Sequence, residues 1–202
     1  MTKYFSALID IIKSYHFYSF LVLGFEIFFN IRYGIRFNKF DNYKNDLYTD
    51  PVPCCFYFMR KINNFFQKNR IDKICDLGSG YGKMIFYFGK VKKKKIDGIE
   101  LNKEIFDSTF YLCDKNINIY NDDILNFGLS KMRYQAFIVN NPLKKDEDFD
   151  LLLSNLEKLD KKIFIVFINI NKTKQEKVQK KLNLIENFKI SSSRGILFCK
   201  TI

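Results

Sequence analysis

Hydrophobic and polar residues change their pattern near residue 71. Upstream, apolar residues recur at helical spacing and predict a helix over about 55–68. Downstream, short apolar runs alternate with longer segments of helical periodicity. The short runs predict strands over 72–78, 95–101, 117–123, 134–141, 162–170, 184–190 and 195–202. Strands that alternate with helices are typical of an open parallel sheet with helices on both faces.

The end of the chain breaks this alternation. The last two predicted strands are joined only by the short polar stretch "SSSR", which is typical of a hairpin. We therefore expect an α/β fold with a Rossmann-like seven-stranded sheet, mostly parallel, whose last strand is antiparallel. This domain should span residues 46–202, after an N-terminal helical extension over 1–45.

The extension contains a strongly apolar segment, "YHFYSFLVLGFEIFF", over residues 15–29. It is shorter than the ~20 residues of a spanning helix, and Glu26 interrupts it. Two arrangements of residues 15–36 remain. The segment packs on protein, as a lid or as the contact in a homodimer, or it lies on a membrane surface with Lys13, Arg32 and Arg36 near the headgroups. We favour packing on protein.

The formal net charge of +12 is spread along the chain, with one dense lysine block over 90–95. This block predicts a solvated helix end, and contact with RNA is the alternative. The five cysteines form no C-x-x-C pair, and the chain has one histidine, so no zinc-ligand pattern can be assembled. We expect a reducing, cytoplasmic environment, with membrane association if the N-terminal segment contacts lipid. Cys75 and Cys199 should act as small buried hydrophobes.

The stretch "DLGSGYGK" places a glycine-rich turn between the first predicted strand of the sheet and a helix. Gly78, Gly80 and Gly82 allow a tight turn and close approach to a ligand. The spacing is not the G-x-G-x-x-G of dinucleotide sites. Asp76 would repel a pyrophosphate but suits an ammonium group. S-adenosylmethionine carries an ammonium group and no phosphate.

Two further acidic positions follow at the next predicted strand ends. Glu100 can accept both hydroxyls of a ribose, and an acid in "NDD" (121–123) can accept from an adenine amino group. Each feature alone has an ordinary explanation: a strand–helix turn, a polar strand end or a helix cap. Because all three features occur together, at the ends of successive predicted strands, they favour a site for S-adenosylmethionine.

At these residues the chain resembles the class I S-adenosylmethionine-dependent methyltransferases, over about residues 50–202. The segments before the turn also resemble, more loosely, small bacterial enzymes and the related protein-lysine methyltransferases. The resemblance implies that Asp76 and the glycines hold the methionine end, that Glu100 holds the ribose, and that Asp123, or alternatively Asp122, holds the adenine. We also expect Leu77, Ser79, Leu101 and Ile124, within or beside these segments, and Asn140, at the end of the fourth predicted strand, to contribute to the cofactor site.

The fourth predicted strand of the sheet ends in "NNPL", residues 140–143. Amino-group methyltransferases often carry Asn/Asp-Pro-Pro-aromatic there, so Asn141 is the candidate catalytic residue. The missing aromatic ring argues against a flipped adenine as acceptor, and Asn-Pro is also common in simple turns. We expect methyl transfer to a nitrogen or oxygen of a small molecule or protein side chain. The alternatives are an RNA methyltransferase and a degenerate cofactor-binding partner subunit.

Overall fold

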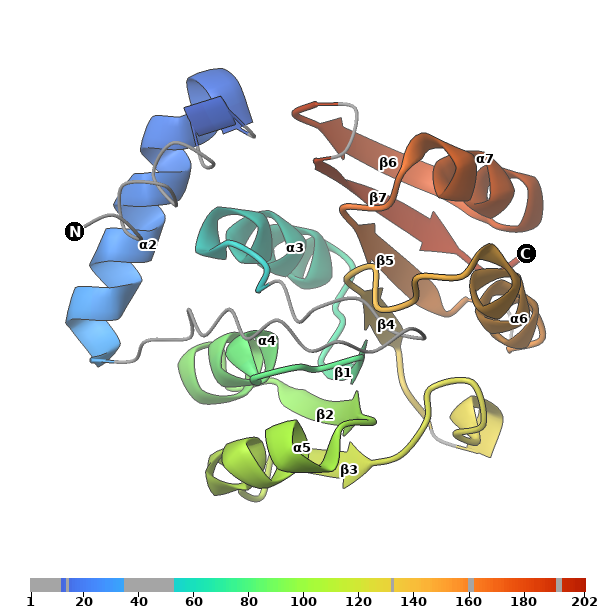
Figure 1. Cartoon of the computed structure of the whole chain (residues 1–202), viewed down its shortest axis with the longest axis horizontal. Coiled ribbons are helices and arrows are strands. Elements are labelled where there is room, and N and C mark those ends of the chain that lie inside the picture. The colour runs from blue at the N-terminus through green and yellow to red at the C-terminus, as the bar shows by residue number, and fades with distance from the viewer. Residues whose placement is uncertain (1–11, 14, 35–52, 132, 160–161, 192–193) are drawn as a thin grey trace.

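The computed structural model describes residues 12–13, 15–34, 53–131, 133–159, 162–191 and 194–202. Its centre is a seven-stranded sheet in the order β3-β2-β1-β4-β5-β7-β6 (Figure 1). The strands are β1 (Lys73–Leu77), β2 (Lys95–Glu100), β3 (Ile117–Asn121), β4 (Ala136–Val139), β5 (Phe164–Ile168), β6 (Asn183–Lys189) and β7 (Gly195–Lys200). Neighbouring strands among β1 to β5 pair in parallel, and β7 runs antiparallel to β5 and β6. The predicted sheet and its antiparallel last strand are confirmed.

The described helices are α2 (Ser19–Tyr33), α3 (Phe56–Lys68), α4 (Lys83–Ile85), α5 (Lys103–Thr109), α6 (Asp146–Glu157) and α7 (Lys172–Lys181). Two of them differ from the sequence prediction. The helix after the glycine turn continues beyond α4 as a π-helical segment, η2 (Phe86–Val91). The helix after β2, which the sequence pattern predicts over 103–115, ends at Thr109, where the hydroxyl groups of Ser108 and Thr109 donate to the carbonyls of Ile105 and Phe106. Such side-chain bonds compete with the backbone bonds of a continuing helix.

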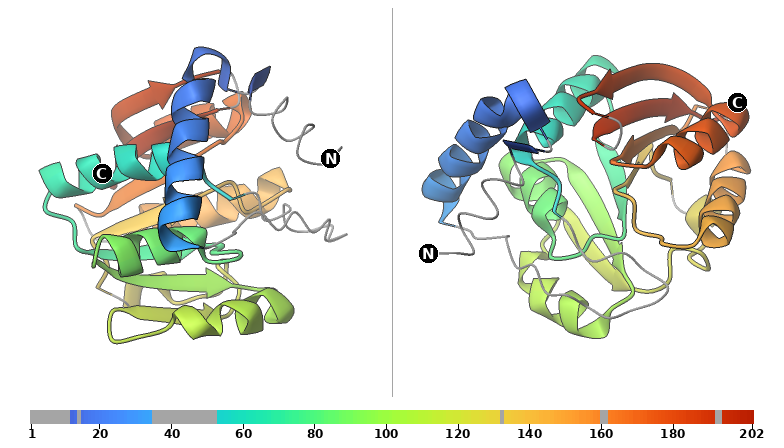
Figure 2. Two further views of the ribbon diagram at one scale, coloured as in Figure 1. Left: turned by 90° about the vertical axis from the view of Figure 1, so that its left-hand side faces the viewer. Right: turned by 45° about the horizontal axis from the view of Figure 1, so that its top comes forward.

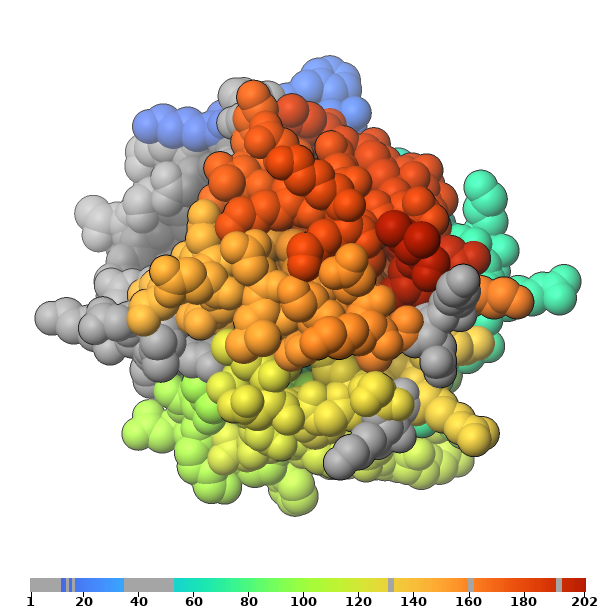
Figure 3. All heavy atoms as spheres, turned by 90° about the vertical axis from the view of Figure 1, so that its right-hand side faces the viewer, coloured from blue at the N-terminus to red at the C-terminus, as the bar shows by residue number. Residues whose placement is uncertain are grey.

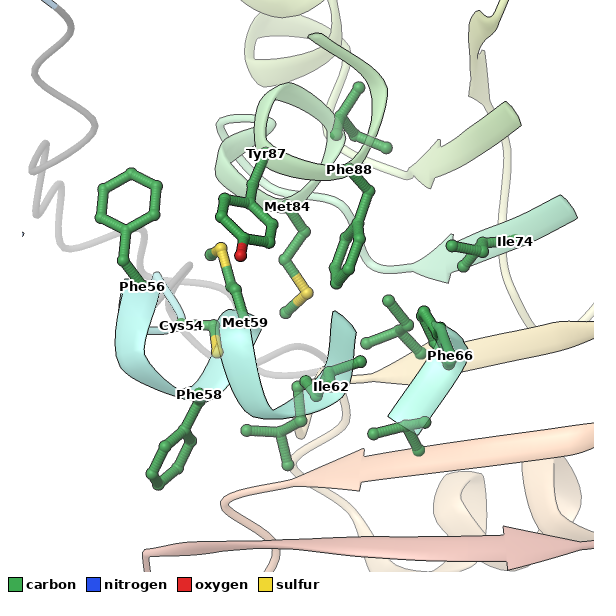
Figure 4. Packing of buried hydrophobic residues seen from close by; sticks show 14 of the residues in the cluster. Cys54, Phe56, Phe58, Met59, Ile62, Phe66, Ile74, Met84, Tyr87 and Phe88 are labelled. Carbon is green, nitrogen blue, oxygen red and sulfur yellow. The ribbon is translucent and has the colours of Figure 1, made fainter. Parts of the chain in front are cut away.

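Alternate strand residues point to opposite sides of the sheet. Apolar residues occur on both sides, and helices cover both faces. Residues of α3, α4 and α5 share one apolar core with Ile74, and residues of α6 and α7 share another with Cys75. Figure 4 shows Met59, Ile62 and Phe66 of α3 near Phe88 and Ile74 in the first core. Figure 3 shows the second face, where orange and red C-terminal segments lie above the yellow segment that follows β3. Cys75 and Cys199 are buried in the second core, as predicted.

The helix α2 packs on α3 and contributes Val22 and Phe29 to the first core (Figure 2). Phe29 stacks on Phe56, with ring centroids 4.3 Å apart. Packing on the domain, one of the two predicted arrangements, is thus present for this helix. The predicted boundary between residues 45 and 46 lies outside the described residues. Among the described residues, no helix has both the length and the apolar character needed to cross a bilayer.

Candidate functional site

The glycine turn follows β1 and is hydrogen-bonded to the end of β2. The backbone N–H groups of Gly78 and Ser79 donate to the carbonyl of Ile99 at 3.0 and 2.9 Å. Gly78 has φ +83°, and a Cβ built on it would lie 2.7 Å from Cβ of Pro142, in the loop after β4. Three strand ends, those of β1, β2 and β4, therefore meet at this turn.

The contact at Gly78 gives a test of the turn's backbone. Gly78→Ala should lower the free energy of unfolding by about 2 kcal/mol. The alanine would have to adopt a left-handed backbone conformation, and its methyl group would clash with Pro142. The matched control is Gly24→Ala in α2, where nothing lies within 4 Å of an added Cβ. That variant should raise the free energy by about 0.5–1 kcal/mol through helix propensity. Urea unfolding measures both, and equal effects would contradict the turn geometry.

Asp76 lies in β1, two residues before Gly78, and is 1% exposed. Its Oδ1 atom has no hydrogen-bond partner in the described structure. Burial raises the pKa of this carboxyl well above its usual range, and the nearby charge of Glu100 raises it further. Buried polar atoms are normally paired. An enclosed acid with one oxygen that has no donor is therefore suited to a cationic ligand.

Glu100 ends β2 and connects this strand to the glycine turn. Its Oε2 atom accepts from the N–H of Gly80 at 2.8 Å, and its Oε1 atom accepts from the N–H of Asn102 at 2.9 Å. Burial raises the pKa of Glu100, and the backbone N–H groups that it accepts from oppose this rise. Each carboxylate oxygen offers more than one lone pair. The side chain can thus position the turn and still accept from ligand hydroxyls.

The end of β3 lies beside Glu100, since the N–H of Asp122 donates to the carbonyl of Glu100 at 3.2 Å. Asp123 accepts from the N–H of Leu125 at 2.9 Å and from the amide of Asn126 at 3.3 Å. Its carboxylate therefore caps the following turn, which is the ordinary explanation for an acid at this position. Asp122 is exposed, with Oδ1 accepting from the N–H of Asp123 at 2.7 Å. That Asp123, or alternatively Asp122, serves an adenine stays a prediction.

The remaining predicted cofactor residues take different places around the turn. Leu77 and Ile124 are fully or nearly fully buried in the second core, whereas Leu101 is exposed. Ser79 is buried, and its hydroxyl oxygen has no hydrogen-bond partner in the described structure. Asn140 directly follows β4, next to β1 in the sheet. The strand ends thus gather the predicted residues on one edge of the sheet.

The segment after β4 is held by a lysine that the sequence pattern did not single out. Lys174, in α7, donates to Oδ1 of Asn141 at 2.9 Å and to the carbonyl of Leu143 at 2.6 Å. Burial lowers the pKa of this ammonium group. Asn141, the predicted catalytic residue, has φ +45°, and its amide is held by a helix residue 33 positions away. Its catalytic role stays a prediction.

A second missed pair lies next to the glycine turn. Lys83, the residue after Gly82, donates to both carboxylate oxygens of Glu26 in α2, at 3.0 and 2.8 Å. The same carboxylate accepts from the N–H of Phe56 at 2.8 Å, at the start of α3. The motif contains Lys83, but no local pattern indicates a partner 57 residues upstream. The pair links the N-terminal helix directly to the turn.

The strand order, the glycine turn and the acids at the ends of β1 and β2 define the fold as that of the class I S-adenosylmethionine-dependent methyltransferases. Comparison with solved structures supports this. The N-methyltransferase NodS from Bradyrhizobium japonicum WM9 aligns with a TM-score of 0.55 and 12% identity, over 72% of this chain and 96% of that one. The methyltransferase domain of bacterial CtHen1 aligns with a TM-score of 0.59 and 12% identity, over 72% of this chain and 97% of that one.

A third similar structure is magnesium protoporphyrin IX methyltransferase (ChlM) from Synechocystis PCC 6803 with bound SAM. It aligns with a TM-score of 0.58 and 11% identity, over 72% of this chain and 79% of that one. At these identities the likeness shows the fold. No protein-family model matches the chain, and no curated protein matches its sequence. The predicted resemblance is confirmed at the level of the fold.

Proposed function

We propose that this chain is an S-adenosylmethionine-dependent methyltransferase that methylates a nitrogen or oxygen of a small molecule or protein side chain. The observation that carries the proposal is the buried carboxylate of Asp76, just before the glycine turn, whose Oδ1 atom has no hydrogen-bond partner among the described residues. An unpaired buried acid is costly to keep. A ligand ammonium group would supply the missing partner, and a pyrophosphate would not.

The residues around the turn fit the remaining parts of S-adenosylmethionine. When bound, this cofactor supplies a methyl group on a sulfonium centre. Asp76 would hold its ammonium group, and Glu100 would accept from its ribose hydroxyls. The glycines leave room for close approach of the backbone. These residues bind and align, which is the main task of a protein when the donor already carries its leaving group.

Two asparagines at neighbouring strand ends favour an acceptor that carries N–H or O–H groups. Val139 of β4 and Phe167 of β5 are paired in the sheet. Asn141 follows Val139 by two residues, and Asn169 follows Phe167 by two residues, so the asparagines lie at corresponding strand ends. Both have positive φ, +45° and +55°. The Oδ1 atom of Asn169 is enclosed without a hydrogen-bond partner in the described structure. A donor on the acceptor molecule would satisfy this oxygen.

Calorimetry with S-adenosylmethionine and S-adenosylhomocysteine tests the cofactor site. We expect both to bind, and we expect Glu100→Ala to weaken each at least about tenfold, or ~1.4 kcal/mol. Glu100→Gln keeps one acceptor oxygen for the N–H of Gly80 and should give an intermediate loss. The matched control is Glu186→Ala on β6, an exposed acid on the outermost strand, four strands away from β1.

The controls separate the outcomes. If Glu100→Ala binds both ligands as the wild type does, the ribose assignment is wrong. If the wild type binds neither ligand, the proposed function is wrong. Unfolding curves recorded for every variant show whether a loss of binding reflects a loss of folding.

One observation favours a second candidate, a partner subunit that binds the cofactor without catalysis. The amide oxygen of Asn141, expected to accept from a target nitrogen, accepts instead from Lys174. Incubation with methyl-labelled cofactor and a whole-cell extract distinguishes the two functions. Label in an acceptor supports the enzyme, whereas tight binding with no transferred label supports the partner subunit.

A further inference from the structure

The helix α2 and the turn before it carry apolar residues on the side that faces away from the sheet. Phe17, Phe20 and Ile31 are 86%, 85% and 79% exposed. With the residues between them at helical spacing, they form what we call the outer face: Phe17, Phe20, Leu21, Gly24, Ile27, Phe28 and Ile31. Figure 2 (left) shows α2 lying across the outside of the molecule, where this face can meet a partner.

The charged side chains of this segment divide by sign: its cations are exposed and its acid points into the molecule. Lys13 and Arg32 are exposed near the two ends of the outer face. The single acid of α2, Glu26, is turned inward, where it pairs with Lys83 and accepts from the N–H of Phe56. The segment therefore presents aromatic and aliphatic side chains between two cations, and its negative charge is neutralised within the molecule.

This charge pattern distinguishes two occupants of the outer face. If a second copy packed its own α2 there, Lys13 and Arg32 would meet cations in either helix orientation, with no acid of α2 to pair with them. An anionic lipid surface supplies the opposite charge at both ends and an apolar layer between them. The fifteen residues of α2 span about 22 Å, which suits a helix lying in the interface.

We propose that the outer face of α2 binds an anionic membrane surface, with its phenylalanine side chains inserted at the level of the headgroups. The inner face of the helix stays packed on α3. Because Glu26 pairs with Lys83 beside the glycine turn, this contact would hold the candidate cofactor site close to the bilayer. The binding surface itself does not depend on the proposed methyl transfer, and its test needs no acceptor.

The chain contains no tryptophan, so one introduced tryptophan reports on its own surroundings. In the full chain, the emission of Phe20→Trp should shift to shorter wavelength with vesicles containing about one quarter phosphatidylglycerol in phosphatidylcholine. Pure phosphatidylcholine should give a much smaller shift. The matched control is Phe110→Trp, an exposed position after α5, 60% exposed, which should not respond.

Charge and apolar variants complete the test by flotation with the same vesicles. Phe17→Ser with Phe28→Ser, and separately Lys13→Glu with Arg32→Glu, should each lower the bound fraction at least about tenfold. No shift and no flotation with either vesicle would overturn the proposal. A shift without vesicles would also overturn it: a concentration-dependent shift indicates a second copy, and a concentration-independent shift indicates cover by the same chain.

Discussion

Asp76→Asn is expected to make this protein more stable at neutral pH and to weaken its binding of S-adenosylmethionine by about a hundredfold, ~2.7 kcal/mol. The two effects have one cause. Burial and the charge of Glu100 raise the pKa of Asp76 in the folded protein. The ionised carboxylate is therefore costly to keep without a ligand, and it is the group that a ligand ammonium needs.

The sign of the stability change follows from proton linkage. The folded chain binds the Asp76 proton more tightly than the unfolded chain, whose aspartate pKa is about 3.9. This contribution to stability is fully present below that pH and is lost as pH rises through the folded pKa. Each unit of the raised pKa costs about 1.4 kcal/mol at higher pH. The neutral asparagine removes this cost, so urea unfolding at pH 7 should show a gain.

Binding should depend on pH in the opposite sense. A cationic ligand needs the ionised acid, so affinity should rise with pH by up to about tenfold per unit and level off above the folded pKa of Asp76. Calorimetry across this range should find a much flatter dependence in Asp76→Asn. The difference between the wild type and the variant isolates this carboxyl from groups on the ligand.

Asp97 in β2 provides the matched control for Asp76. It is also buried, but Tyr134 and Asn118 donate to it at 2.7 and 2.9 Å. Asp97→Asn should therefore lower the free energy of unfolding by about 1–2 kcal/mol, since one donor loses its acceptor. If Asp76→Asn destabilises the protein as Asp97→Asn does, or binds the cofactor normally, Asp76 is a structural residue.

Local patterns made most of the sheet predictable. Apolar runs of strand length and a hairpin-like "SSSR" turn predicted seven strands and the direction of the last one, as observed. The π-helical winding of 86–91 has no such signal. Gly89 in this segment lies so close to Ile117 of β3 that a Cβ would overlap that side chain. This contact exists only once the sheet has assembled.

The candidate site likewise has a part that could be predicted from the sequence and a part that could not. The nearness of Asp76 and Glu100 could be predicted because parallel strands bring successive carboxyl ends to one edge of the sheet. The N–H of Gly80, in the turn after Asp76, donates to Glu100. The contacts of Lys174 with Asn141 and of Glu26 with Lys83 could not be predicted. Each joins residues far apart in sequence, and a lysine or glutamate on a helix is usually a solvated residue.

The ion pair of Glu26 and Lys83 should contribute far more to stability than an exposed ion pair on the same molecule. Both side chains are largely buried, 14% and 6% exposed, and the carboxylate also accepts from the N–H of Phe56. Glu26→Ala leaves a buried ammonium group and a backbone donor without this acceptor. We expect the free energy of unfolding to fall by about 3 kcal/mol.

The exposed pair of Lys103 and Asp107 on α5 is the matched control, with side chains 65% and 58% exposed. Asp107→Ala should cost at most about 0.5 kcal/mol, because solvent screens such a pair. The double variant Glu26→Met with Lys83→Met should recover much of the loss, since it buries no charge. Urea unfolding of Glu26→Met, Lys83→Met and the double variant measures the coupling of the two residues. A loss in Glu26→Ala no larger than that in Asp107→Ala would show that the N-terminal helix is not anchored through this pair.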